Sequence, residues 1–510
     1  MTDRLSATDA AFLYAEDAST PQHVGGVVLL EPEPGAFDYQ QFVDLISARL
    51  SLVPRYRQRV RLVPGRLARP VWVDDEDFDL MYHVRRSALP KPGTSAQLED
   101  LIARLISRPL DRNRPLWELY VIEGLENGRV ALVNKTHHAM VDRIGAVDVA
   151  AAILDLSKRP RSLPEQPWIP MPAPSDVDLV VDAIADISSR PSDLLDVARL
   201  AAADVGSTVA KAARFSAEVL EALRRTIKPA PRSVLNVTIS GQRRFATFRV
   251  GLADVKAIRS EHSASVNDVI LAVITAALRT WLLSRGEAVT ATTTLRALVP
   301  MSVRAAPSVE GGSDQGSSPV VSYVIDLPVA EPNPVMRLHQ VSFAMAAHSE
   351  SGRQVGADSL LALGRFAPPT LHGLGARVAG GLSGRLYNVL ITNVPGPQVP
   401  LYAAGSQVVA MYPVAPLTNG QALAVACTSY HGSVFFGLTA DGIAIPDIEE
   451  FAEHIGDAVE ELLPHHAEGP AEVDPPPLRR PARGKPGTKQ SKRGPAVPRR
   501  PGGREPGEYR

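Results

Sequence analysis

Closely spaced prolines interrupt this 510-residue chain between two regions of mixed helix and strand pattern. Proline lacks a backbone N–H and clashes inside a helix, so a dense run of prolines excludes regular structure and marks a linker. The prolines stand at positions 160, 164, 167, 170, 172 and 174. A chain of this length can bury a large core and is expected to form more than one domain. We therefore expect an N-terminal lobe over residues 1–158, the linker and amphipathic helices over 159–234, a C-terminal lobe over 235–465 and a tail over 466–510.

The spacing of apolar residues predicts helices and strands on both sides of this break. In the first region, helices are expected over residues 42–50 and 96–106, and strands over 24–30, 118–122 and 130–134. In the second region, a helix is expected over residues 267–284, and strands over 295–300, 320–327, 386–393, 422–430 and 434–438. Both regions are therefore expected to be mixed α/β.

Composition excludes several classes of function. Lys and Arg number 54 and Asp and Glu 55, and this balance argues against a general nucleic-acid binder. The single cysteine, Cys427, excludes an intrachain disulfide framework and a cysteine-rich metal site, and we expect it to be a small buried hydrophobe. The first residues do not resemble a secretory signal, and the most apolar run (269–283) is short for a membrane span and interrupted by Arg279. A cytoplasmic protein is expected, with peripheral membrane contact left open.

Two segments outside the mixed α/β regions leave alternatives open. Residues 176–226 have the charge spacing of two or three amphipathic helices, which could lie on a membrane or lipid-droplet surface or pack on the protein. The tail is rich in Pro, Gly, Arg and Lys and has few large aliphatic residues, so it cannot bury enough apolar surface to fold alone. Its charge could attract anionic lipid or polyanions, or it could be solvated without a specific partner.

The sequence around residue 138 carries the clearest chemical pattern. Two adjacent histidines, His137 and His138, are followed four residues after the second by Asp142. Acyl transfer from a thioester to an alcohol needs a base that deprotonates the hydroxyl and donors that stabilise the developing oxyanion. Imidazole suits the first task because its unperturbed pKa is about 6.5. We expect His138 to be the general base and Asp142 to be a structural anion that fixes the turn around it.

The same three residues are compatible with two further roles. The histidine pair and the nearby aspartate could also belong to a metal site. However, no further ligand stands at a convincing spacing, so no metal is expected. Two histidines satisfied by hydrogen bonds in a core would produce the same residues without chemistry. A serine or cysteine nucleophile is not required, and the chain has no Gly-x-Ser-x-Gly elbow.

Short segments along the chain resemble the bacterial wax ester synthase/diacylglycerol acyltransferase family in order and spacing. They cover residues 1–160 and 235–465 and are specific as a set, although each is weak alone. The matching segments are LSATDAAF (5–12), TPQHVGG (20–26), PRYRQR (54–59), PVWVDD (70–75), FD (78–79), PLDR (109–112), PLWEL (115–119), EGL (123–125), ND (267–268), VPMSVR (299–304), NVPGP (393–397), SYHG (429–432) and FG (436–437).

This resemblance implies a fold of the α/β (α+β) class, with two chloramphenicol-acetyltransferase-like lobes and an active-site channel between them. It implies transfer of an acyl group from acyl-CoA, as co-substrate, to a long-chain alcohol or to diacylglycerol, with no cofactor. His138 matches the position of the proton acceptor, and His137 and Asp142 match its motif partners.

The resemblance also suggests substrate-binding residues in the second lobe. Asn267 and Asp268 would lie near the acyl channel, although the same pair could instead cap the helix that it begins. Arg304 is the candidate partner of Asp142, and a surface position for Arg304 is the alternative. Residues 393–397 are expected to form a rigid turn near the channel, for which a purely structural role is also open.

Arg143 departs from the family pattern, which usually has glycine after the motif aspartate. Glycine there can serve a positive φ or a close backbone approach, and arginine is poor at both. Three outcomes stay open. Arg143 could point outward and leave catalysis intact, hold an anionic group of CoA, or narrow the channel and leave a weak or inactive family member that binds acyl-CoA or lipid.

Overall fold

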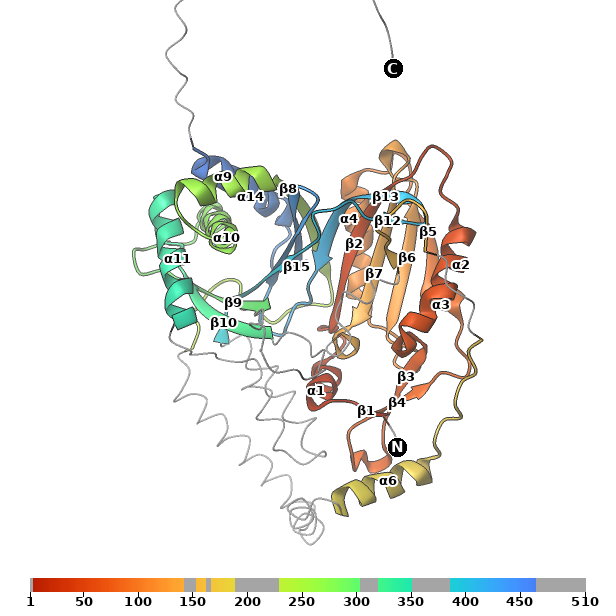
Figure 1. The fold of residues 1–510 in the computed structure, drawn as a ribbon. Coiled ribbons are helices and arrows are strands. Elements are labelled where there is room, and N and C mark those ends of the chain that lie inside the picture. The colour runs from red at the N-terminus through yellow and green to blue at the C-terminus, as the bar shows by residue number, and fades with distance from the viewer. Residues whose placement is uncertain are drawn as a thin grey trace, which may run out of the picture. The chain divides into compact units, whose positions relative to one another are not determined.

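The computed structural model describes residues 3–141, 153–161, 167–188, 229–302, 320–350 and 386–464, all within one compact unit, Met1–Pro464. In this described part of the chain the strands form two six-stranded sheets and one three-stranded sheet (Figure 1). Each helix and strand predicted above for these residues is present, with ends that differ by up to three residues. The tail predicted over 466–510 and the helices predicted beyond Ser188 lie outside the described residues.

The first six-stranded sheet contains most of the strands of the N-terminal lobe. Its strands, in spatial order, are β12 (Tyr402–Ala403), β13 (Ser406–Val414), β2 (His23–Glu31), β7 (Val130–His137), β6 (Trp117–Glu123) and β5 (Val84–Ala88). The neighbouring pairs are antiparallel except β5 with β6, which is parallel.

Helices cover both faces of this first sheet. On one face α2 (Tyr39–Arg49) packs Phe42 and Ile46 in a core with Leu132 of β7. On the other face α4 (Ser95–Ser107) packs Ile102 in a core with Val133 of the same strand. Successive strand residues point to opposite faces, so a strand covered on both sides must be apolar throughout. This explains the continuous apolar run at the start of β7.

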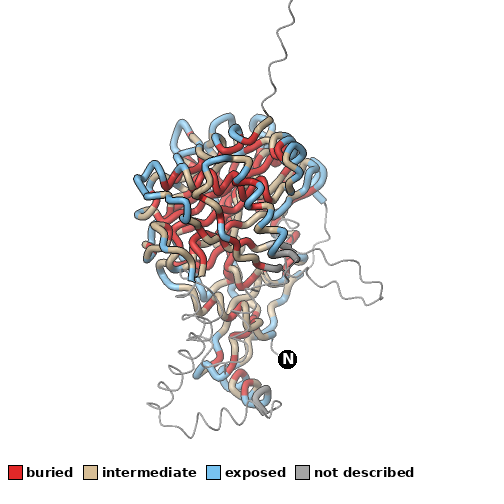
Figure 2. The backbone as a smooth tube through the Cα atoms, turned by 90° about the vertical axis from the view of Figure 1, so that its left-hand side faces the viewer, coloured by how far each residue is buried: buried red, intermediate tan, exposed pale blue. Residues whose placement is uncertain are grey.

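The second six-stranded sheet contains most of the strands that follow the linker. Its order is β10 (Val320–Leu327), β9 (Leu295–Ser302), β11 (Val389–Pro395), β14 (Leu423–Tyr430), β15 (Ser433–Asp441) and β8 (Arg243–Gly251). The helices of this lobe are α9 (Leu252–Glu261), α10 (Val266–Ser284), α11 (Pro334–Glu350) and α14 (Ile448–Leu462). They share one large apolar core with the sheet, seen as the buried backbone in Figure 2.

β13 crosses from the second lobe into the first sheet. It follows β11 in the chain, yet it pairs antiparallel with β2, with Tyr412 opposite Val27. The segment expected as a C-terminal lobe over 235–465 is therefore not confined to one sheet. Its strand at residues 406–414 completes the N-terminal sheet instead.

The remaining described elements are a small sheet, three helices and several short turns. The three-stranded sheet has the order β1 (Asp3–Arg4), β4 (Val71–Asp74) and β3 (Gln58–Arg61). The helices are α1 (Ala7–Ala15), α3 (Leu80–His83) and α6 (Asp176–Ser188). Short 3-10 turns are η1 (Leu50–Leu52), η2 (Pro54–Arg57), η3 (Pro64–Arg66), η4 (Glu126–Gly128) and η5 (His138–Met140).

Among the described helices, α10 alone is long and apolar enough to cross a membrane by length and composition. About two thirds of its most apolar stretch is buried inside the protein (67%), as in the core helix of a globular lobe. Its start is fixed by a capping box, in which the Ser265 hydroxyl accepts from the Asp268 N–H at 3.1 Å and the Asp268 carboxylate accepts from the Ser265 N–H at 2.9 Å.

Candidate active site

The two motif histidines lie where β7 ends. His137 is the last residue of the strand and pairs with His23, the first residue of β2. The His137 N–H donates to Leu116 O and the His138 N–H donates to Gln22 O, each at 2.9 Å. These bonds fix the backbone where β7 ends and the η5 turn begins. The backbone positions of both histidines are therefore defined.

His138 packs against the first helix of the chain. Its ring stacks on Phe12 of α1, with the ring centroids 3.8 Å apart and the planes at 25°. Burial, helped by the neighbouring His137, lowers the pKa of His138 from 6.5 to about 4. Its buried Nδ1 has no hydrogen-bond partner among the described residues. The imidazole is therefore neutral at pH 7, the protonation state that a general base requires.

His137 is fully buried and has a defined tautomer. Its Nδ1 accepts a hydrogen bond from the Ala139 N–H at 3.0 Å. Because Nδ1 accepts, the proton of the neutral ring is on Nε2. Nε2 lies 3.5 Å from Oε2 of Glu16. The first motif histidine thus caps the turn that carries the second, and its proton faces a carboxylate.

Glu16 is a carboxylate that sequence patterns did not identify. Only 5% of its side chain is exposed, and Arg112 donates to its Oε2 from Nη2 at 2.5 Å. His23 Nε2 lies 3.4 Å from its Oε1. Burial alone would raise the pKa of Glu16, but His137, His23 and Arg112 outweigh burial and hold that pKa far below its usual range. Glu16 is therefore an anion at every pH at which the protein would be assayed.

The structure joins two of the segments that resemble the family. Asn267, at the start of α10, accepts a hydrogen bond at Oδ1 from Nδ2 of Asn393 on β11, at 3.3 Å. The Nδ2 of Asn267 is buried and has no partner among the described residues. Asp268 makes the capping box described above. A channel role for the Asn267–Asp268 pair stays a prediction.

Three residues singled out in the sequence lie outside the described residues: Asp142, Arg143 and Arg304. The predicted contact between Asp142 and Arg304 therefore stays a prediction. Within the described ranges, no group of three or more His, Cys, Asp or Glu side chains could hold a metal ion.

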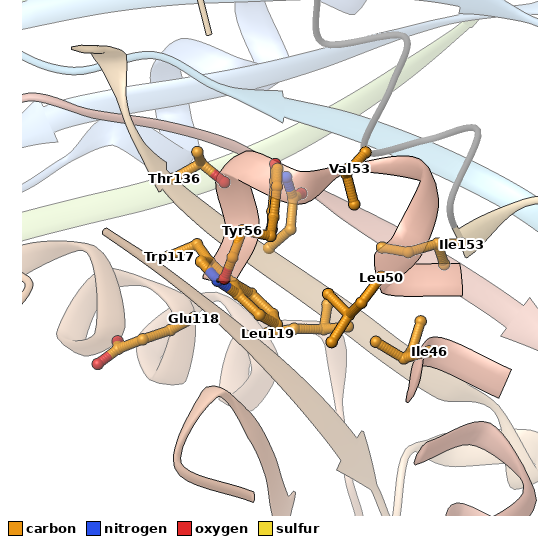
Figure 3. A pocket seen from close by; sticks show the side chains of 10 residues that line it. Ile46, Leu50, Val53, Tyr56, Trp117, Glu118, Leu119, Thr136 and Ile153 are labelled. Atoms are coloured by element: carbon orange, nitrogen blue, oxygen red, sulfur yellow. Dashed lines mark hydrogen bonds between the residues drawn. The ribbon is translucent and has the colours of Figure 1, made fainter. Parts of the chain in front are cut away.

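An apolar cavity lies beside β6 and β7 (Figure 3). Thr136 lines it, and the following residue, His137, points to the opposite face of the sheet because strand side chains alternate. Neither motif histidine lines the cavity. Its residues come from α2, the turns after it, β6, β7 and Ile153: Ile46, Leu50, Val53, Tyr56, Trp117, Glu118, Leu119, Asn134, Thr136 and Ile153. The cavity therefore lies in the apolar core that α2 forms with the first sheet, and not at the two motif histidines.

With this geometry known, comparison with known families is decisive. Residues 5–270 match the wax ester synthase/diacylglycerol acyltransferase catalytic domain, and residues 320–463 match the C-terminal domain of the same family. The chain belongs to the wax ester synthase/diacylglycerol acyltransferase family. It is an acyltransferase, as the resemblance predicted.

Individual relatives agree with this family assignment. A probable diacylglycerol O-acyltransferase of Mycobacterium tuberculosis (tgs3) is 41% identical over 263 residues, which are 51% of this chain and 97% of that relative. Another from the same organism (tgs2) is 32% identical over 479 residues, covering 90% of this chain and 98% of the relative.

Solved structures support the fold class. A wax ester synthase/diacylglycerol acyltransferase from Marinobacter aquaeolei VT8 matches with a TM-score of 0.65 at 27% identity, covering 90% of this chain and 98% of that one. The starter condensation domain of rhizomide synthetase matches with a TM-score of 0.51 at 13% identity, covering 91% and 94%. The predicted class of two related α/β lobes is confirmed.

Proposed function

We propose that this family member transfers the acyl group of acyl-CoA to the hydroxyl of diacylglycerol, giving triacylglycerol, or of a long-chain alcohol, giving a wax ester. The observation that carries the proposal is the neutral, half-buried His138 directly after β7, within the family's histidine motif. The names of the relatives support diacylglycerol as an acceptor. The reaction needs acyl-CoA as co-substrate and no metal or other cofactor.

In the proposed reaction His138 takes the proton of the acceptor hydroxyl while the oxygen attacks the thioester carbonyl carbon. The tetrahedral intermediate then collapses, the carbon–sulfur bond breaks, and CoA leaves as a thiolate. An imidazolium whose pKa is near 4 is a strong enough acid to protonate that thiolate, because an ordinary thiol has a pKa of about 8.5. One imidazole therefore serves as base and then as acid.

The other predicted residues have supporting roles in this proposal. Asp142 fixes the motif and pairs with Arg304, while Asn267 and Asp268 lie along the acyl channel. Because acceptor and product are apolar lipids, the protein works at a membrane or lipid-droplet surface as a peripheral protein.

Arg143 favours a second candidate function, that of a weak or inactive family member that binds acyl-CoA or lipid without turnover. Arginine stands where the family motif has glycine, and it brings a permanent charge and a long side chain next to Asp142. A nearby cation disfavours imidazolium, so the charge alone does not spoil a neutral base.

One assay separates the two candidates. Purified full-length protein is incubated with palmitoyl-CoA and either dioleoylglycerol or hexadecanol, and free CoA and ester product are measured for the wild type and for Arg143→Gly. The proposal predicts acceptor-dependent CoA release that matches ester formation, and an Arg143→Gly rate within about tenfold of wild type. Binding of palmitoyl-CoA without release, or a low rate that Arg143→Gly raises strongly, would favour the second candidate.

A further inference from the structure

We propose that Glu16 is the positioning carboxylate of the histidine motif: it holds His137 in the tautomer that caps the η5 turn, and through that turn it orients His138. This inference rests on the proposed role of His138 as the base. Glu16 acts on the base through its contact with His137.

Arginine and backbone N–H groups donate to the Glu16 carboxylate, and the ring nitrogens of two histidines face it. Oε2 receives Nε and Nη2 of Arg112, at 3.1 and 2.5 Å, and faces Nε2 of His137 at 3.5 Å. Oε1 receives the Gln22 N–H at 3.3 Å and faces Nε2 of His23 at 3.4 Å. A carboxylate can accept on both oxygens, whereas a carboxamide would turn an NH₂ group toward donors on one side or the other. The site is therefore built for an anion.

A carboxylate with so little exposure is costly unless charges and hydrogen bonds compensate it. Arg112 supplies the opposite charge from the surface, since half of its side chain is exposed (50%), and its Nη2 also donates to Leu13 O of α1 at 2.8 Å. Arg112 thus ties the end of α1 to the carboxylate. The ion pair holds the Glu16 carboxylate beside His137.

The same short helix and its C-cap contact both motif histidines. Phe12 lies in α1 and Glu16 is the C-cap four residues later, where the Glu16 N–H donates to Phe12 O at 3.2 Å. Phe12 stacks on His138, and Glu16 faces His137. The end of α1 therefore contacts the base, His138, through the ring of Phe12. It contacts His137, which caps the η5 turn, through the carboxylate of Glu16.

The link from Glu16 to His138 passes through a single hydrogen bond. With the proton of His137 directed to Glu16 at Nε2, Nδ1 keeps its lone pair for the Ala139 N–H. If the proton moved to Nδ1, two N–H groups would face each other and the start of η5 would lose its cap. His138 is the first residue of that turn, so the change would move the base rather than remove it.

The experiment compares Glu16→Met, which removes all acceptors, with Glu16→Gln, which restores one oxygen. The matched control is Glu31→Gln, because Glu31 also pairs with an arginine (Arg129, at 2.9 Å) but lies on the half-exposed end of β2. We expect kcat to fall in the order wild type, Glu16→Gln, Glu16→Met, by about 10- to 100-fold in total, the range found for carboxylates that orient metal-bound histidines. KM for palmitoyl-CoA should stay within about twofold, because acyl-CoA binding is not changed.

A second measurement does not depend on activity. In full-length protein labelled with ¹⁵N-histidine, the signals of His137 are assigned by their loss in His137→Gln. Wild type and Glu31→Gln should show the Nε2–H tautomer, and Glu16→Met should show a mixture of tautomers. If the wild type releases no CoA with any acceptor, the proposed function fails, and the tautomer of His137 still decides the role of Glu16.

Two results would overturn the proposal: kcat of folded Glu16→Met within about twofold of wild type, or an unchanged Nε2–H signal of His137 in that variant. If Glu16→Met does not fold, Arg112→Gln replaces it, because Arg112 is half-exposed and its removal leaves the carboxylate present but unfixed. Arg112→Gln should lower kcat less than Glu16→Met would, and unchanged kcat and tautomer would overturn the proposal equally.

Discussion

His138 lies against Phe12 at the end of β7, and its burial lowers its pKa to about 4. The sign of this shift determines the pH dependence of catalysis. A depressed pKa means that the base stays neutral until the pH approaches 4, well below the ordinary value of about 6.5. We expect kcat/KM for acyl transfer to be nearly constant from pH 8 to about pH 5 and to fall only below that. An acidic limb with its midpoint near 6.5 would contradict this environment for the base.

The same shifts affect stability, so the pH profile needs a control. His138 and His23 each have a pKa lowered to about 4, mainly by burial, and the unfolded chain binds their protons more readily. Between about pH 6.5 and pH 4 the free energy of unfolding should therefore decrease as the pH falls. Circular dichroism at each pH separates a loss of folded protein from protonation of the base.

For individual residues, the sequence predicted the two motif histidines but not the ion pair of Glu16 and Arg112 beside them. His137 and His138 are adjacent, and adjacency is visible without a structure. Glu16 and Arg112 reach the site from the end of α1 and from the loop before β6, 96 residues apart in the chain. No local spacing encodes a contact between residues so far apart. Asp142 and Arg304 stay predictions for the same chemistry.

Strands and helices show a similar division between local and distant information. Apolar spacing predicted α10 and the strands β2, β7 and β14, because each pattern lies within one element. It did not predict that β13 would leave its lobe and pair with β2. That pairing depends on contacts between strands far apart in the chain.

Gly437 on β15 has no side chain, and this allows β13 to pass close to β15. A Cβ at Gly437 would lie 1.9 Å from Pro413 O of β13, closer than atoms can approach. We expect Gly437→Ala to push β13 away from β15 and to lower the free energy of unfolding by about 1–3 kcal/mol. The measurement is urea denaturation, with Gly241→Ala as control because a Cβ there meets nothing within 4 Å. Equal stability of the two variants would mean that β13 does not pass so close to β15.

Across the whole unit, contacts between segments far apart in the chain join the elements of the two lobes. Glu99 of α4 accepts from the Thr247 N–H and hydroxyl of β8, at 2.8 and 2.5 Å, and Arg243 of β8 donates to Ser19 O after α1. The family match extends over both lobes, at residues 5–270 and 320–463. The class of fold could be predicted from the sequence because the family segments are spread along the chain, while these bridging contacts could not.

In the proposed reaction His138 is the base of an acyl transfer from CoA. This claim is tested by CoA release from palmitoyl-CoA, with dioleoylglycerol or hexadecanol as acceptor, by His138→Ala and by His339→Ala. His339 is an exposed histidine on α11 and serves as the matched control. We predict that His138→Ala stays folded and loses at least about 100-fold in rate, while His339→Ala keeps the wild-type rate. Wild-type CoA release by folded His138→Ala would contradict the claim.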